Sequence, residues 1–113
     1  MFGDSSTESG NARGGGNDLL DGGPDGDVLI GDSATLTGSA SGGGADKVIG
    51  GGGSDIMFGD SHAQGGSEAG GGKDVLEAGA GPDSLDGGPR HDRCDGDGGT
   101  DTASRCEASA GIP

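Results

Sequence analysis

Residues 50–58 read GGGGSDIMF and residues 78–86 read AGAGPDSLD, and the pattern that these two nonapeptides share decides the fold. Each has six turn-like positions, approximately Gly-Gly-x-Gly-x-Asp, followed by three residues whose middle member is apolar. Three extended residues place only the central side chain on one face, because side chains alternate along a strand. The pattern therefore predicts a glycine-rich turn followed by a very short strand with one inward residue.

The aspartate that ends each turn recurs at regular intervals. Successive separations are 9, 19, 9, 19, 9, 9 and 9 residues, so nine is the basic unit and 28 is a superperiod. The aspartates are Asp18, Asp27, Asp46, Asp55, Asp74, Asp83, Asp92 and Asp101. The strand centres expected to point inward are Leu20, Leu29, Val48, Met57, Leu76, Leu85, Cys94 and Ala103. Stacked units would join these side chains into one narrow core.

The composition excludes a conventional single-core globule. The 113 residues include 31 glycines, 4 prolines and only 15 Leu, Ile, Val and Phe residues, and the formal net charge is −14. Such a chain is disordered unless a strict repeat lets many units share a core. The charge disfavours nucleic acid and attracts cations, and the 16 Asp against 4 Glu suit turns and hard cations. No apolar run is long enough for a membrane span.

The registered copies resemble the RTX, or haemolysin-type, calcium-binding nonapeptide repeat. The resemblance implies an all-β fold, a right-handed parallel β-roll in which short strands form two stacked sheets and each turn provides half of a Ca²⁺ site. We assign residues 1–107 to the roll and residues 108–113 to a flexible C-terminal tail. The roll begins in the middle of a repeat, since Met1 and Phe2 hold strand positions of a unit whose turn is absent. We expect either a fragment of a larger protein or an internal methionine taken as the start.

Each 19-residue gap follows a repeated phrase, seen in Gly31-Asp32-Ser33 and Gly59-Asp60-Ser61. We interpret the gaps as enlarged turns, which puts successive turns on alternate edges of the roll. Turns 3–18, 31–46, 59–74 and 87–92 then share one edge, and compact turns 22–27, 50–55, 78–83 and 96–101 share the other. The alternative is a degenerate repeat hidden in each gap, with Thr35-Leu36-Thr37 as its strand. It is the weaker interpretation, because His62-Ala63-Gln64-Gly65 offers no strand-like triplet.

The resemblance also implies the calcium ligands. One ion lies between successive turns of an edge, held by positions two, four and six of the first turn and one, three and six of the next, which gives about six Ca²⁺ in all. The compact-edge ligands are Gly23, Asp25, Asp27, Gly50, Gly51, Gly52, Gly53, Asp55, Ala78, Gly79, Ala80, Gly81, Asp83, Gly96, Gly98 and Asp101. The ligands of the other edge are Gly14, Gly16, Asp18, Ser41, Gly42, Gly43, Gly44, Asp46, Ala69, Gly70, Gly71, Gly72, Asp74, Gly87, Pro89 and Asp92.

Some turn positions depart from the pattern. Asp4, Asp32 and Asp60 recur at position two of the enlarged turns, either as additional carboxylate ligands or as Asx-type loop caps. Asp25 stands at a position that is normally glycine, and Gly26 after it suggests that the two residues have exchanged roles. In turn 87–92, Pro89, Arg90 and His91 replace small residues, and a cation at position four is unfavourable beside Ca²⁺. The three replacements in turn 87–92 make its site the weakest prediction.

Cys94 and Cys106 are the two cysteines of the chain. We expect them to form a disulfide at the end of the roll, worth on the order of 3 kcal/mol. Such a bond would indicate an oxidising compartment, and the alternative is two free thiols.

An apolar column is expected on the outer face of one sheet. Its members are Phe2, Val28, Ile30, Ile56 and Phe58. The column indicates contact with another copy or with a neighbouring domain. The alternative is the ordinary preference of strands for β-branched residues.

The sequence thus predicts a calcium-binding, non-enzymatic structural module that folds when it meets Ca²⁺ outside the cell, as part of a larger secreted protein. Neither His62 nor His91 lies near a plausible nucleophile, which argues against catalysis. Alternatives are a Ca²⁺-stabilised surface that binds a polysaccharide or ice, and the non-catalytic repeat region of a secreted enzyme or toxin.

Overall fold

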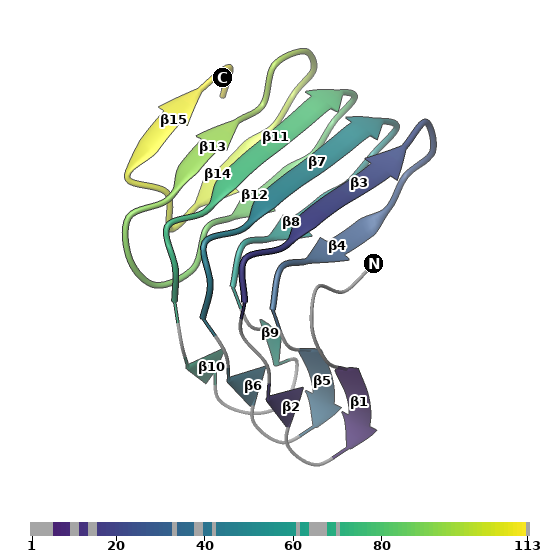
Figure 1. Ribbon diagram of the computed structural model, residues 1–113. Coiled ribbons are helices and arrows are strands. Elements are labelled where there is room, and N and C mark those ends of the chain that lie inside the picture. The colour runs from purple at the N-terminus through teal and green to yellow at the C-terminus, as the bar shows by residue number, and fades with distance from the viewer. Residues whose placement is uncertain are drawn as a thin grey trace.

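A computed structural model describes residues 6–9, 12–13, 16–32, 34–37, 40–41, 43–60, 62–63, 68–69 and 71–112. These residues form strands and turns, and all strand pairs are parallel (Figure 1). The described part of the chain has no helix long and apolar enough to cross a membrane. The predicted all-β, parallel β-roll is confirmed.

Two stacked sheets form the roll. The five-stranded sheet contains, in order, β15 (Ala108–Ala110), β13 (Arg93–Asp95), β11 (Val75–Ala80), β7 (Lys47–Gly52) and β3 (Leu19–Gly23). The four-stranded sheet contains β14 (Thr102–Ser104), β12 (Ser84–Asp86), β8 (Ile56–Phe58) and β4 (Val28–Ile30). Leu20 pairs with Val48, and Leu29 pairs with Met57, so the register equals the 28-residue superperiod.

The predicted core is confirmed. Seven of the expected strand centres are at most 2% exposed, namely Leu20, Leu29, Val48, Met57, Leu76, Leu85 and Cys94. Ala103 is partly buried against them. Each unit supplies one inward side chain, as side-chain alternation over a three-residue strand requires.

The alternation of turns between the two edges is also confirmed. Compact turn 22–27 joins β3 to β4, and turns 50–55, 78–83 and 96–101 make the equivalent connections from the five-stranded to the four-stranded sheet. The chain returns on the other edge, where turn 87–92 joins β12 to β13. We call these the compact edge and the long-turn edge.

The enlarged turns contain strands, which corrects the preferred interpretation of them as loops. The first strands, β1 (Ser6–Ser9), β5 (Ala34–Thr37) and β9 (His62–Ala63), form one three-stranded sheet. The second strands, β2 (Ala12–Arg13), β6 (Ala40–Ser41) and β10 (Glu68–Ala69), form another. Both lie in a lobe beside the roll (Figure 1). Thr35-Leu36-Thr37 is therefore a strand, as the alternative proposed, but it belongs to this lobe.

The enlarged turns can form strands because parallel pairing joins backbone groups. Successive excursions have equal length, so Ser6 pairs with Ala34 and Ala34 with His62 at the same 28-residue offset. Hydrogen bonds between such strands need no apolar triplet. The absence of a strand-like pattern at His62 was consequently a misleading signal.

Two further differences concern the C-terminus and the outer face. Strand β15 pairs with β13, so the strand ladder continues past residue 107, where the roll was predicted to end. Ile30, expected on the outer apolar column, is only 4% exposed and belongs to a buried run at residues 29–32. Val28 and Ile56 are 48% and 45% exposed as expected, Phe58 is half-buried, and Phe2 lies outside the described residues.

Candidate calcium sites

A ladder of aspartates runs along the compact edge. The backbone N–H of Asp27 donates to Oδ1 of Asp55, and the N–H of Asp55 donates to Oδ1 of Asp83, both at 2.8 Å. Asp83 donates in the same way to Oδ1 of Asp101 at 2.9 Å. Each carboxylate thus uses one oxygen to tie its turn to the preceding one.

The long-turn edge carries an equivalent ladder in spite of its inserted residues. The N–H groups of Asp18 and Asp46 donate to Oδ1 of Asp46 and Asp74, at 2.7 and 2.8 Å. The N–H of Asp74 donates to Oδ1 of Asp92 at 2.9 Å. Asp92 donates to Oε2 of Glu107 at 2.8 Å, so a glutamate outside the nonapeptide pattern ends this ladder.

The second oxygen of these carboxylates is buried and lacks a hydrogen-bond donor among the described residues. This holds for Oδ2 of Asp18, Asp55, Asp60, Asp74, Asp83, Asp92 and Asp101. Several of these side chains are almost completely buried, with Asp55 and Asp74 only 1% exposed. An ionised carboxylate oxygen is costly to bury unless a cation or a donor compensates it. The arrangement therefore fits a cation.

Backbone carbonyls lie beside these oxygens because glycines let successive turns approach closely. A Cβ added to Gly50 would contact both Oδ2 of Asp55 and the carbonyl oxygen of Ala78, 2.5 Å away. A Cβ on Gly22 would lie 2.7 Å from both Oδ2 of Asp27 and the carbonyl of Gly50. Carboxylate and carbonyl oxygens thus face the same space at the first position of each turn.

Positive φ angles aim the compact-turn carbonyls. Gly51 and Gly79, at position two, have φ of 103° and 99°, and Gly53 and Gly81, at position four, have φ of 114° and 137°. Other residues adopt these angles poorly, which explains the glycines. In the first turn, Gly23 has φ 104°, whereas neither Asp25 nor Gly26 has positive φ, so the expected exchange of roles is wrong.

On the long-turn edge, the structure corrects which residues stand at position one. Counting back from Asp46 and Asp74 nominated Ser41 and Ala69, but these residues pair with each other in the β2-β6-β10 sheet of the lobe. Gly59 takes the place instead, because a Cβ on it would lie 2.6 Å from Oδ2 of Asp74 and 2.7 Å from the carbonyl of Gly87. Gly31 holds the equivalent place beside Asp46.

The excursion is therefore inserted within a turn. Comparison with 87–92 assigns positions one and two of turn 59–74 to Gly59 and Asp60, and the ten residues 61–70 separate them from the rest. Gly71 and Gly72 resume the turn, since a Cβ on Gly71 would lie 2.5 Å from the carbonyl of Pro89. The repeated phrase beginning at Gly31 and Gly59 was the available signal. Gly14, Gly42, Gly70 and Asp4 lie outside the described residues.

Asp32 and Asp60, at position two, give the enlarged turns 31–46 and 59–74 a second carboxylate each. Oxygens of Asp18, Asp32 and Asp46 lie within 4.8 Å of one another, as do oxygens of Asp60, Asp74 and Asp92. Oδ1 of Asp60 accepts the N–H of Gly72 at 2.8 Å, which leaves Oδ2 in the cluster. This placement favours the ligand interpretation of Asp32 and Asp60 over that of a simple loop cap.

Burial and mutual repulsion raise the pKa values of this cluster. Burial, with the charges of Asp92 and Asp32 adding to it, raises the pKa of Asp60 to about 7. Burial and the charges of Asp60 and Asp92 likewise raise the pKa of Asp74 to about 7. The pKa of Asp92 is raised to about 6 by burial and then by Glu107. On the compact edge, burial raises the pKa of Asp55. A bound divalent cation would relieve these costs.

Turn 87–92 keeps the turn geometry despite its unusual residues. Arg90, at position four, has φ 101°, and compact turns 50–55, 78–83 and 96–101 have a glycine with positive φ at the same position. A Cβ on Gly71 would meet Cγ of Arg90 at 3.1 Å, so the aliphatic part of this side chain packs against the neighbouring turn. His91 and Arg90 are exposed.

The donor set selects the kind of cation. Carboxylate and carbonyl oxygens from glycine-rich turns are hard ligands, which suit Ca²⁺ with its six to eight oxygens better than they suit transition metals. Three basic side chains form ion pairs with carboxylates outside the two ladders: Lys47 pairs with Glu77, Arg93 with Asp95 and Arg105 with Asp86.

The family model of the RTX calcium-binding nonapeptide repeat matches residues 14–34, 40–61 and 68–103, in four copies. The chain belongs to the RTX calcium-binding repeat family. The match covers well over half of the chain and includes both aspartate ladders. No curated protein and no solved structure matches the chain.

Family membership makes the chain a calcium-binding module, and RTX repeats are typically non-catalytic. The predicted disulfide is present: Cys94 and Cys106 are joined, with their Cα atoms 6.0 Å apart. Glu107 lies beyond the matched residues, and no sequence pattern pointed to it.

Proposed function

We propose that this RTX roll is a structural module that folds when Ca²⁺ binds between its turns, and that it works outside the cell within a larger secreted protein. The observation that carries the proposal is the double row of buried Oδ2 atoms without donors, among them those of Asp55, Asp83 and Asp74. A fold that buries so many carboxylates needs cations to compensate them.

About six ions follow from three gaps between successive turns on each edge. In the compact gap between turns 50–55 and 78–83, the proposed ligands are the carbonyls of positions two and four, those of positions one and three of the next turn, and both aspartates. On the long-turn edge, Gly31 and Gly59 replace Ser41 and Ala69 at position one, and Asp32 and Asp60 add carboxylates. Six divalent ions would nearly neutralise the net charge of −14.

Folding and binding are coupled because the sites exist only when the turns are stacked. The hydrogen bonds between neighbouring ladder aspartates span 28 or 18 residues, so an unfolded chain does not assemble them. Metal-binding free energy then becomes folding free energy. Calcium is abundant outside cells and scarce inside, so linkage keeps the chain unfolded until export. The disulfide fits the same oxidising location.

Far-UV circular dichroism during a calcium titration of chelator-treated protein tests the proposal, with Mg²⁺ as the control. We expect a cooperative coil-to-β transition with Ca²⁺ alone. A β spectrum that chelator leaves unchanged would show that the core and the disulfide suffice, and it would refute calcium-coupled folding.

A contact surface is a second proposal. Val28 and Ile56 pair in register on the outer face of the four-stranded sheet, and both are nearly half exposed. Adjacent exposed apolar side chains favour contact with a neighbouring domain or a second copy. Light scattering of the Ca²⁺-loaded protein distinguishes the two. A dimer that Ile56→Thr dissociates would identify a second copy, whereas a monomer would point to a neighbouring domain.

A further inference from the structure

The long-turn edge does not end at the last nonapeptide. Asp92 donates its N–H to Oε2 of Glu107 at 2.8 Å, as Asp74 donates to Oδ1 of Asp92 at 2.9 Å. Glu107 therefore occupies the ladder position of an aspartate. It reaches this position from outside the matched family region, which ends at residue 103.

The backbone before Glu107 also takes the place of a turn. A Cβ on Gly87 would lie 2.5 Å from the carbonyl oxygen of Arg105 and 2.9 Å from Oδ2 of Asp92. One turn earlier, a Cβ on Gly59 would meet the carbonyl of Gly87 and Oδ2 of Asp74 at nearly the same distances. Arg105 thus supplies the carbonyl that the first glycine supplies in a repeat.

The side chain of Asp92 gives separate evidence that a cation binds here. Its side chain is only 2% exposed, and its Oδ2 atom has no hydrogen-bond donor among the described residues. This oxygen faces the space that it shares with the Arg105 carbonyl. Glu107 is exposed, so water can complete the coordination of an ion at this open end.

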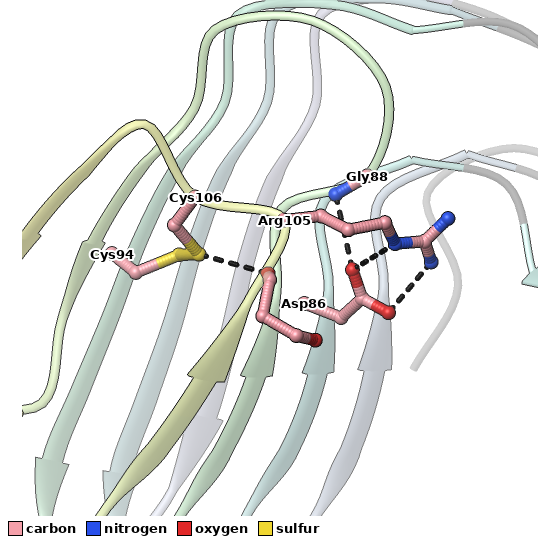
Figure 2. Close-up of polar contacts among 6 residues, drawn as sticks. Asp86, Gly88, Cys94, Arg105 and Cys106 are labelled. Carbon is pink, nitrogen blue, oxygen red and sulfur yellow. Dashed lines mark hydrogen bonds and ion pairs between the residues drawn. A yellow bond between two sulfur atoms is a disulfide. The ribbon is translucent and has the colours of Figure 1, made fainter.

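The segment that carries Glu107 is anchored on both sides. Arg105 forms a two-point ion pair with Asp86, with Nε to Oδ1 at 2.7 Å and Nη2 to Oδ2 at 2.6 Å (Figure 2). Cys106 is held by the disulfide to Cys94, and Ala108 begins strand β15 in register with Arg93. Two-point arginine pairs and disulfides both restrict local motion, so the folded roll holds this carboxylate in place.

We propose that Glu107, the Arg105 carbonyl and Asp92 form a terminal calcium site, in addition to the sites between nonapeptide turns. The inference rests on the proposed calcium-coupled function.

Calcium stoichiometry by native mass spectrometry tests the terminal site. Glu107→Gln should bind one ion fewer than the parent chain, and its weakest calcium-binding step by calorimetry should disappear. Glu77→Gln is the matched control, because it removes one surface carboxylate that pairs with Lys47 and belongs to neither aspartate ladder. Circular dichroism at saturating Ca²⁺ verifies that both variants are folded.

The outcomes separate this site from the proposed function. Equal stoichiometry and affinity in the Glu107→Gln and Glu77→Gln variants would overturn the terminal site while leaving calcium binding intact. A parent chain that binds no Ca²⁺ would overturn both proposals. Should Glu107→Gln fail to fold, Glu107→Asp decides. It keeps the charge but shortens the reach, and it should weaken one ion by about tenfold or more, since ligand charge and fit set calcium affinity.

Discussion

The compact edge and the long-turn edge are built on the same aspartate ladder, but they differ in the charge that each turn carries. On the compact edge, Asp55 and Asp83 each stand alone at the end of a glycine turn. On the long-turn edge, Asp60 joins Asp74 and Asp92 within 4.8 Å, and the pKa values of Asp60 and Asp74 rise to about 7. The long-turn edge therefore depends more strongly on a bound cation.

The comparison also shows what a roll turn must preserve. Ten residues are inserted between positions two and three, yet Asp46 and Asp74 still meet at 2.8 Å. An insertion is tolerated when its ends remain close, because the entropic cost of a longer loop grows slowly with length. Here the insertion also adds its own paired strands.

The largest effect should come from filling the space between stacked turns. A Cβ at Gly72 on the long-turn edge would fall on the carbonyl of Gly44, and one at Gly81 on the compact edge would fall on that of Gly53. We expect Gly72→Ala and Gly81→Ala each to lose more than about 4 kcal/mol of stability with Ca²⁺ present, in the range reserved for severe steric conflicts. Denaturant titration measures the loss.

Gly52→Ala is the control for these variants, since its nearest neighbour, the carbonyl of Pro24, would be 3.6 Å away. It should change stability little. If Gly72→Ala were as stable as Gly52→Ala, the long-turn edge would stack more loosely than the compact edge.

Reduction of the Cys94–Cys106 disulfide should have the next largest effect. The bond closes a loop of 12 residues at the C-terminal end of the roll, so its loss should cost about 3 kcal/mol. Hydrogen exchange should accelerate in β15 and at Glu107, while the amides of Asp55 and Asp83 on the compact edge stay protected. Uniform acceleration along both edges would contradict this local role. A Cys94→Ala, Cys106→Ala double variant should not respond to reductant.

Neutralising one ladder carboxylate should distinguish the edges in the absence of calcium. Asp74→Asn removes a negative charge that is destabilised by burial and by the charges of Asp60 and Asp92. The Oδ1 atom of the substituted side chain can still accept the N–H of Asp46. We expect the free energy of unfolding of the chelated protein to rise by about 1–3 kcal/mol, because a raised carboxyl pKa means that the charged form destabilises the fold. Asp55→Asn on the compact edge should gain less. The osmolyte trimethylamine N-oxide favours compact states, so the concentration that folds each chelated variant, followed by circular dichroism, provides the measurement. A larger gain for Asp55→Asn would reverse the ranking of the edges.

The pH dependence of the chelated protein should show the smallest effect. The folded-state pKa values of Asp60 and Asp74, about 7, exceed the ordinary value of 3.8, so the folded chain binds these protons more tightly than the unfolded chain does. The metal-free fold should therefore gain stability as the pH falls from about 7 towards 4. With saturating Ca²⁺ the trend should reverse, because protons compete with the ion. The measurement is the osmolyte concentration that folds the chelated chain at each pH, and a concentration that rises steadily from pH 8 to pH 5 would refute this.

Much of the roll was predictable because the spacing of a few residue types along the sequence shows how every unit of the repeat is built. The 9- and 28-residue spacings identified the core positions, from Leu20 to Cys94, and sorted the turns between two edges. The same spacings located the aspartates that the ladders join, since Asp55 and Asp83 are one superperiod apart.

The predictions failed where the chain departs from an unbroken repeat. Counting back from Asp74 put Ala69 at position one, because counting cannot show that Ala69 pairs with Ser41 in the lobe. Ile30 was expected outside, but it is only 4% exposed. Glu107 lies 15 residues after Asp92, a spacing that matches neither period, so only the folded chain reveals its position in the ladder.

The sequence alone determined the repeat period, the thin core and the abundance of hard oxygen ligands, because each nonapeptide supplies glycines, an aspartate and one apolar residue. The parallel roll followed from the resemblance of these nonapeptides to the RTX repeat. The tertiary structure decided which oxygens meet. Asp60 joins Asp74 and Asp92, and the Arg105 carbonyl and Glu107 close the long-turn edge, because the backbone path of each excursion and of the disulfide-bonded C-terminus sets those distances. Spacing specifies a repeat, whereas the contacts across its interruptions depend on the folded backbone.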